Sequence, residues 1–265
     1  MSSSRVLVGL ERAVATVSLN RPEQRNALDR ILIEELRAAL AELRGRAELR
    51  ALILRGEGST FCAGADLTEM QQLGGADERT NRAAAAALAD LLRQLYTFPR
   101  PTLARVQGAA IGGAVGLVAA CDIGVAAAGA VFGFSEVRLG LLPAVISPYL
   151  VRKVQPARLR ELMLSGERFH AESAQAIGLI QHVVPEPDLD AEVGRRVEQL
   201  LEGGPEAQAA IKELLETVRE LSLPRAADYT VEALAQRRAS SEGQAGLQAF
   251  RTKGKPPWSP SDSSR

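Results

Sequence analysis

The stretch at residues 111–126, IGGAVGLVAACDIGVA, restricts the possible fold of this chain more than any other segment. It consists almost entirely of glycine, alanine and valine, with a single acid, Asp122. A membrane-spanning helix needs about 20 strongly apolar residues. Asp122 interrupts this run, and glycine and alanine contribute little transfer energy, so we expect buried structure without a membrane span. The stretch itself leaves two interpretations open. It is either a helix of the core, or a segment whose exposed backbone groups take part in a reaction.

The charge balance of the whole chain gives no electrostatic reason to expect nucleic acid or an anionic membrane as a partner. Its 265 residues include 32 basic and 32 acidic ones, so the formal net charge is zero. The N-terminal residues lack the long apolar core of a signal peptide. The two cysteines, Cys62 and Cys121, lie in apolar contexts, which indicates reduced thiols. We therefore expect a cytoplasmic protein.

The spacing of apolar residues predicts alternating strands and helices. Residues 5–19 contain two short alternating segments around Glu11 and Arg12, which predicts a hairpin. Five leucines at helical spacing predict a helix over residues 26–45, with Asn26 as its N-cap and Gly45 as its stop. A second long helix is expected to end before Pro99, and further strands are expected at 49–55, 101–111, 122–129 and 130–136. This alternation favours an α/β fold with a buried, partly parallel sheet.

The C-terminal part of the sequence has a different pattern. From about Pro205 the pattern is helical throughout, and Pro224 separates two helical segments. The tail at residues 251–265 is polar and rich in proline and serine, which predicts that its last residues are mobile. We therefore expect a core at residues 1–200 and a helical region at 201–265 that packs on a neighbouring subunit.

Two strand-to-helix turns could expose backbone amides. The first lies in residues 56–70, GEGSTFCAGADLTEM, where composition alone favours a tight turn with Asp66 as helix cap. The alternative is that its N–H groups donate to a developing oxyanion. The second turn is at Gly112 and Gly113, where glycine lets backbone approach a ligand and a helix start adds a positive dipole end. Close packing of helix on strand would also favour small residues there.

Glu136 is the main candidate for proton transfer. It lies between Phe134 and an apolar loop, and burial of a carboxylate raises its pKa toward neutrality. An exposed acid paired with Arg138 is an equally good interpretation of the sequence alone. His170 and His182 have no partners at metal-ligand spacing, so no metal site is expected.

Together these segments resemble the enoyl-CoA hydratase/isomerase family, the crotonases. The matching segments, in order along the chain, are LNRPEQRNALD at 19–29, FCAGADL at 61–67, VQGAAIGGAVGLVAACDIGVA at 106–126, FSEVRLGLLPA at 134–144 and FRTKGKPPW at 250–258. The resemblance implies an α/β spiral of ββα units with a C-terminal helical trimerisation region. It also implies a trimer or a dimer of trimers, and an acyl-CoA thioester as substrate, so that coenzyme A is part of the substrate and no separate cofactor is needed.

The resemblance also assigns roles to individual residues. The backbone N–H groups of Ala65 and Gly113 would form an oxyanion hole for the thioester enolate, Glu136 would transfer the proton, and Asp66 would brace the first loop. One preorganised donor of this kind is typically worth about 3–4 kcal/mol of barrier. The residues expected around coenzyme A and the acyl group are Arg25, Ala27, Ala63, Asp66, Leu67, Thr68, Gly112, Gly116, Phe134 and Pro143, with Phe250 and Lys253 reaching the adenine and phosphates from the same or a neighbouring subunit.

Gly116 is where this chain departs from the family pattern. Family hydratases that use two carboxylates carry a glutamate three residues after the oxyanion glycine, and Gly116 occupies that position. A single carboxylate suffices for a 1,3-proton shift or for decarboxylation of a vinylogous acid. It also suffices for hydration if Glu136 both orients the water and supplies the α-proton.

A finer resemblance nevertheless favours hydration. Residues 112–117 and 134–154 resemble the branch that acts on methylglutaconyl-CoA and isohexenylglutaconyl-CoA, in leucine and acyclic terpene breakdown. We therefore predict a hydratase of a branched enoyl-CoA, with an acidic acyl group as one option for which Gly116 would remove a like charge and leave room. The alternatives are a Δ3,Δ2-enoyl-CoA isomerase or a glutaconyl-type decarboxylase. An RNA-binding or non-catalytic relative is a remote alternative, because the chain has no dense basic stripe with interleaved aromatics.

Overall fold

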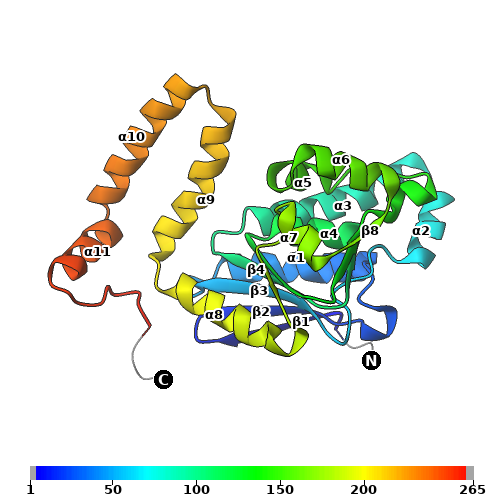
Figure 1. Ribbon diagram of the computed structural model, residues 1–265, viewed down its shortest axis with the longest axis horizontal. Coiled ribbons are helices and arrows are strands. Elements are labelled where there is room, and N and C mark those ends of the chain that lie inside the picture. The colour runs from blue at the N-terminus through cyan, green and yellow to red at the C-terminus, as the bar shows by residue number, and fades with distance from the viewer. Residues whose placement is uncertain (1–3, 261–265) are drawn as a thin grey trace. The chain divides into compact units, whose positions relative to one another are not determined.

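The computed structural model describes residues 4–260, which form two compact units (Figure 1). The first unit comprises the chain up to Phe98 together with Thr102–Gly194. The second comprises Pro99–Pro101 together with the chain from Arg195 onward. None of the helices in the described part has the length and apolarity of a membrane span.

The first unit begins with the hairpin expected from the sequence. Strands β1 (Val6–Glu11) and β2 (Val14–Leu19) pair antiparallel, with Glu11 opposite Val14. Arg12 and Ala13 form the turn with φ of 46° and 67°. Two consecutive residues with positive φ are typical of the two-residue turn whose twist matches that of the flanking strands. Strand β1 of this hairpin lies at one edge of the main sheet.

The main sheet has the strand order β1-β2-β3-β4-β6-β9. Strands β3 (Ala51–Gly56), β4 (Thr102–Val106), β6 (Ile123–Ala127) and β9 (His182–Val184) continue from β2 in parallel. Most side chains of β3, β4 and β6 are buried, as expected for parallel strands covered on both faces. The predicted α/β class with a partly parallel sheet is confirmed.

Helix α1 (Arg30–Arg44) buries the predicted leucine face. Its N-cap is Asp29, whose Oδ1 accepts a hydrogen bond from Leu32 N at 2.8 Å. The prediction that Asn26 caps this helix is wrong. Asn26 has φ of 56°, and its side-chain amide donates to the carbonyls of Glu57 and Thr60. The buried Asn26 amide is therefore committed to the loop after β3 and is not available to cap the helix.

The remaining helices of the first unit pack in succession (Figure 1). Helix α1 contacts α3 (Glu78–Tyr96), α3 contacts α4 (Gly113–Ala120), and α4 contacts α5 (Ser147–Lys153). The other helices are α2 (Leu67–Gly74), α6 (Pro156–Ser165), α7 (Ala171–Ala176) and the 3-10 helices η1 (Pro22–Gln24), η2 (Ser135–Leu139) and η3 (Glu186–Asp188). Every residue of α4 after Gly113 is buried.

The predicted strand at 101–111 is interrupted and contributes to two sheets. Gly108 has φ of +63°, and a Cβ there would lie 3.1 Å from Cα of Thr60, so the chain bends closely past the loop after β3. The buried Gln107 fixes this bend by donating to the carbonyls of Gly56 and Gly58. The chain then continues as β5 (Ala109–Ile111) in a second sheet of order β5-β7-β8, formed with β7 (Val131–Gly133) and β8 (Arg168–His170).

The second unit is helical. It contains the end of α8 (Leu189–Leu201), then α9 (Pro205–Glu220), α10 (Leu223–Ala239) and α11 (Ser241–Arg251). The carboxylate of Glu242 caps α9 by accepting from the N–H groups of Glu206 and Ala207. Trp258 donates to the carbonyl of Glu202. The end of the expected mobile tail, residues 261–265, lies outside the described residues.

Candidate active site

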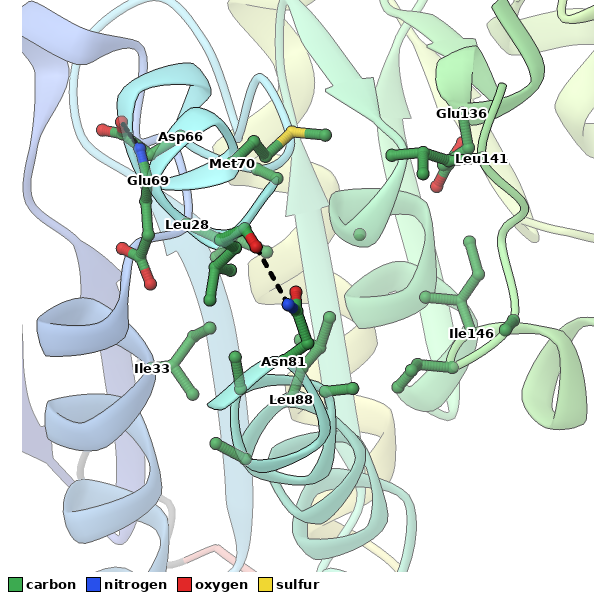
Figure 2. A pocket seen from close by; sticks show the side chains of 18 of the residues that line it. Leu28, Ile33, Asp66, Glu69, Met70, Asn81, Leu88, Glu136, Leu141 and Ile146 are labelled. Atoms are coloured by element: carbon green, nitrogen blue, oxygen red, sulfur yellow. Dashed lines mark hydrogen bonds between the residues drawn. The ribbon is translucent and has the colours of Figure 1, made fainter. Parts of the chain in front are cut away.

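The first unit contains an apolar cavity of about 420 Å³. Figure 2 shows that its wall includes the start of α1 and the loop before it, helices α2 and α3, and the segment that follows Glu136. The lining residues are Leu28, Arg30, Ile33, Ala65, Asp66, Glu69, Met70, Leu73, Asn81, Ala84, Ala85, Ala87, Leu88, Gly113, Glu136, Leu141, Leu142, Pro143, Ala144, Val145 and Ile146. Ala65, Gly113 and Glu136, the three predicted catalytic residues, therefore face one cavity.

Strand register explains why Ala65 and Gly113 meet. The segment after β3 runs parallel to β5, with Cys62 opposite Ala110. Hydrogen bonds from Cys62 N to Ala109 O and from Ile111 N to Cys62 O hold this register. Three residues further along each segment are Ala65 and Gly113, so a parallel arrangement carries both to the same end of the ladder. Both residues line the cavity.

The backbone N–H groups of Ala65 and Gly113 are available to a ligand. Within residues 4–260, neither group donates to another protein atom. Gly113 is the first residue of α4, so its N–H belongs to the helix terminus with the partial positive charge. Two donors of this kind beside an apolar cavity are suited to bind an oxygen that gains negative charge.

Glu136 reaches the cavity from the end of the neighbouring strand. Strand β7 pairs parallel with β5, and Gly112 N donates to Gly133 O at 2.8 Å. Gly112 has φ of +55°, and a Cβ on it would lie 3.1 Å from Oε1 of Glu136. Glycine at position 112 is therefore required both by the backbone conformation and by the carboxylate that lies above it.

The Glu136 carboxylate is in a poorly solvated position. Its Oε2 is buried and has no hydrogen-bond partner in the described structure. Desolvation raises the pKa of Glu136 above its ordinary value. No ion pair joins Glu136 to Arg138 among the described residues, which supports the first of the two interpretations of the sequence. Glu136 can therefore exchange a proton with a bound molecule at a pH closer to neutrality than an exposed glutamate could.

Asp66 is both the N-cap of α2 and part of an ion pair. Its Oδ1 accepts from the N–H groups of Thr68 and Glu69 at 3.0 and 3.3 Å, and its Oδ2 lies 3.1 Å from Nη2 of Arg21. Burial favours the protonated form of Asp66, but these hydrogen bonds, led by the one from Glu69 N–H, outweigh it, and the pKa of Asp66 is lowered. Asp66 is therefore an anion that braces the loop carrying Ala65.

The two predicted glycines of α4 have different surroundings. A Cβ on Gly113 would lie 3.1 Å from Cδ1 of Leu28, within the cavity lining. A Cβ on Gly116 would collide with Ile146, whose own Cβ is 2.8 Å away. Gly116 is buried and is not among the lining residues. The space that Gly116 was expected to leave for an acyl carboxylate is filled by Ile146.

The other predicted binding residues fall into separate groups. Pro143 lines the cavity, and Thr68 lines a smaller polar hollow that shares Asp66 and Glu69 with it. Phe134 is fully buried, with its ring centroid 5.9 Å from that of Phe169, and does not reach the cavity.

Three of the residues predicted to contact coenzyme A, Arg25, Ala27 and Ala63, take part in backbone hydrogen bonds that hold the loops together. Ala63 N donates to the carbonyl of Arg25 at 2.9 Å, and the carbonyl of the buried Ala27 accepts from Arg21. Leu67 is exposed. Phe250 and Lys253 belong to the second unit, where the ring of Phe250 is 86% exposed.

Two features of the site were not predicted from the sequence. Arg21 lies in the segment 19–29 that carries the family resemblance, but the predicted binding residue of that segment is Arg25. The position of Arg21 shortly before the predicted helix is the sequence signal that could have identified it as a site residue. Ile146 gave no such signal, because its contact with Gly116 joins residues that are distant in the sequence. No cluster of residues suited to hold a metal ion occurs between residues 4 and 260.

Comparison with known proteins identifies the family. The family model described as "Enoyl-CoA hydratase/isomerase" matches residues 9–261. The chain belongs to this family. The predicted family is thereby confirmed, whereas the branch within it stays a prediction.

Three relatives illustrate the similarity. A protein of Rhodobacter capsulatus named "Probable enoyl-CoA hydratase" is 36% identical over 97% of this chain and 98% of its own length. The "Enoyl-CoA hydratase domain-containing protein 2, mitochondrial" of Bos taurus is 40% identical over 67% of this chain but only 60% of its own length. The crystal structure of an enoyl-CoA hydratase from Shewanella pealeana matches with a TM-score of 0.93 and 38% identity over 96% of each chain. These similarities confirm the crotonase-type fold.

Proposed function

We propose that this protein is an enoyl-CoA hydratase in which Glu136 is the single acid–base group. The main support is the meeting of three features in one cavity: an unpaired, poorly solvated carboxylate and two backbone N–H donors from Ala65 and Gly113. The names of full-length relatives such as the Rhodobacter capsulatus protein agree with this reaction.

In the proposed reaction, the thioester oxygen accepts hydrogen bonds from Ala65 and Gly113 and becomes an enolate oxygen. Ionised Glu136 accepts a proton from a water molecule while the water oxygen bonds to the β-carbon. The π electrons of the double bond move toward the thioester oxygen. Protonated Glu136 then returns the proton to the α-carbon, so that one water has been added and the carboxylate is regenerated. General acid–base groups typically contribute about 10²–10⁴ in rate.

We propose a branched, apolar acyl group as the substrate class. Support comes from the lining of the cavity, which is dominated by leucine, isoleucine, valine and alanine side chains. The acidic option of the methylglutaconyl type finds less support. Arg30 is the cationic residue on the described lining, and its Nη1 already pairs with Glu34 at 2.9 Å.

A Δ3,Δ2-enoyl-CoA isomerase is a second candidate, favoured by one observation. Ile146, an apolar side chain, fills the place beside Gly116 where two-carboxylate hydratases would have a second acid. A 1,3-proton shift needs only Glu136 to remove and return the proton. Incubation with crotonyl-CoA, a branched apolar 2-enoyl-CoA, a 3-enoyl-CoA and methylglutaconyl-CoA, followed by mass spectrometry and chromatography, separates the candidates. Hydration adds one water, isomerisation changes retention at constant mass, and decarboxylation removes carbon dioxide. No conversion of any of the four would refute the proposal.

We further propose a homo-oligomer, a trimer or a dimer of trimers, in a reducing compartment such as the cytoplasm. Exposed apolar side chains on the helices of the second unit support assembly, among them Ile211, Leu215 and Val231. The reducing compartment is supported by Cys62 and Cys121, which are both buried and form no disulfide in the described structure. Light scattering coupled to size-exclusion chromatography tests the assembly, and a monomer at micromolar concentration would contradict it.

A further inference from the structure

Arg21 is a buried arginine that the proposed chemistry does not use. It is 8% exposed. Its Nη2 lies 3.1 Å from Oδ2 of Asp66, and its Nη1 lies 3.1 Å from Oδ2 of Asp29. Nη1 also donates to the carbonyl of Ala27 at 2.7 Å. One guanidinium therefore joins two carboxylates that come from distant parts of the sequence.

Both carboxylates are helix caps that accept from a first helical turn through Oδ1 and face Arg21 through Oδ2. Asp29 accepts from the first turn of α1 through Oδ1, and its Oδ2 forms ion pairs with Arg21 and Arg5. Asp66 accepts from the first turn of α2 through Oδ1 and from Arg21 through Oδ2. The planar fork of an arginine can hold two such acceptors in fixed positions, which a lysine cannot do. Arg21 thus fixes the start of α2 relative to the start of α1.

The start of α2 is also the place where one oxyanion donor is located. Ala65 directly precedes Asp66, and its neighbours are tied to Leu28 on both sides. Leu28 N donates to Gly64 O at 2.7 Å, and Asp66 N donates to Leu28 O at 2.9 Å. Figure 2 shows Asp66 and Leu28 beside the cavity. The peptide that carries the Ala65 N–H is therefore held by Leu28 through Gly64 O and directly adjoins Asp66, the N-cap of α2.

We infer that Arg21 is a positioning residue for the oxyanion donor Ala65 N–H, acting through the Asp66 carboxylate. This inference rests on the proposed function, since it needs a thioester oxygen to act on. Arg21 does not line the cavity, and Asp66 is the lining residue to which its guanidinium donates a hydrogen bond in the described structure. Loss of Arg21 should therefore change the direction of the Ala65 N–H without removing a contact to the acyl group. Misplacement of a catalytic group by about 1 Å can lower a rate about 10²-fold.

The test compares wild type with Arg21→Gln, Arg21→Lys, Asp66→Asn and Asp29→Asn. Arg21→Gln is expected to lower kcat on the best enoyl-CoA substrate about 10–100-fold while KM stays near its wild-type value, since the interaction lost acts mainly on the transition state. Arg21→Lys should give an intermediate kcat. Asp66→Asn keeps a capping oxygen, because asparagine is a good N-cap, and it should lower kcat in the manner of Arg21→Gln.

Asp29→Asn is the matched control. It breaks the ion pair of Asp29 with the same guanidinium, together with the ion pair of Asp29 with Arg5, and leaves a capping side chain on α1. Its melting temperature should fall in the same range as that of Asp66→Asn, but its kcat should fall much less. A merely structural network would give equal kcat losses for the two asparagine variants. That outcome, or an unchanged kcat for Asp66→Asn and Arg21→Gln, would overturn the inference even if one arginine variant failed to fold.

A second readout does not depend on turnover. Acetoacetyl-CoA forms an enolate whose near-ultraviolet absorbance reports stabilisation of negative charge on the thioester side. Arg21→Gln and Asp66→Asn should weaken the enolate signal while butyryl-CoA binds as in wild type. An active wild type with an unchanged signal in both variants would overturn this inference alone. A wild type that neither converts an enoyl-CoA nor stabilises the enolate would overturn the proposed function, and the inference with it.

Discussion

Replacing Glu136 by glutamine should abolish turnover and at the same time stabilise the folded protein at neutral pH. Turnover should fall about 10²–10⁴-fold, because glutamine cannot accept or return a proton. Thioester affinity should change little, since the amide occupies the same volume. The gain in stability has a separate cause, which is the poorly solvated position of the carboxylate.

The size of the gain follows from the surroundings of the carboxylate. Oε2 is buried without a partner, and a buried unsatisfied polar group costs about 1–3 kcal/mol, more when it is charged. Glutamine leaves a neutral polar group there, so the variant recovers the part of the cost that is due to the charge. Since the residue as a whole is only half-buried, the lower end applies, and we expect a gain of about 1 kcal/mol. In a chain of this size that corresponds to a rise in melting temperature of about 2–4 °C.

The gain should depend on pH with a defined sign. The pKa of Glu136 is raised in the folded state, so the protonated form is the one that folding favours. Below the unfolded-state pKa both proteins are neutral at this site, and the difference between them vanishes. As pH rises through the folded-state pKa, wild type acquires the poorly solvated charge and the variant becomes the more stable protein.

The assay is thermal unfolding of wild type and Glu136→Gln at several pH values, with turnover of crotonyl-CoA measured alongside. A glutamine variant that keeps most of its activity would refute the catalytic assignment. A variant that is less stable than wild type at neutral pH, or whose gain does not shrink toward acid pH, would refute the electrostatic reasoning. The two parts can therefore fail independently.

Three further predictions concern other residues. Gly113→Val should prevent binding of crotonyl-CoA with little change in melting temperature, because its side chain enters the cavity beside Leu28; normal binding in a titration would show that Gly113 does not face the ligand. Gly116→Ala should cost about 1–3 kcal/mol in urea unfolding by overpacking against Ile146, and much less in an Ile146→Gly background; equal costs in both backgrounds would contradict the contact. Asp90→Asn should lower stability at neutral pH by up to about 1 kcal/mol, since hydrogen bonds from two arginines lower the pKa of Asp90 to about 2. That difference should shrink as pH falls below 3.8, and a constant difference would speak against the ion pairs.

The parts of the fold that were predictable from the sequence are those set by neighbours along the chain. The leucine spacing of α1 fixed its buried face, and Gly45 is its C-cap as expected. The hairpin turn was placed at Glu11 and Arg12, one residue from its observed position at Arg12 and Ala13. In each case the determining contacts lie within a few residues, where periodicity and turn chemistry are informative.

The parts that were not predictable depend on contacts between distant segments. Asn26 has the chemistry of a helix cap, but its amide binds the loop at residues 57–60, and the sequence alone carries no sign of that contact. The break at Gly108 depends in the same way on the approach of Thr60. Arg21 was overlooked because its role needs Asp29 and Asp66 to be brought together by folding.

The three glycines at the start of α4 are each required for a different structural reason. Gly112 accommodates a positive φ beneath the Glu136 carboxylate, Gly113 leaves the cavity open beside Leu28, and Gly116 receives Ile146. The first two constraints involve groups of the candidate site, whereas the third is a packing contact that a compensating change at Ile146 can relieve. A substitution at Gly116 is therefore the one of the three whose cost should depend on another single side chain. Substitutions at Gly112 meet the carboxylate itself, so they should disturb Glu136 even where the fold tolerates them.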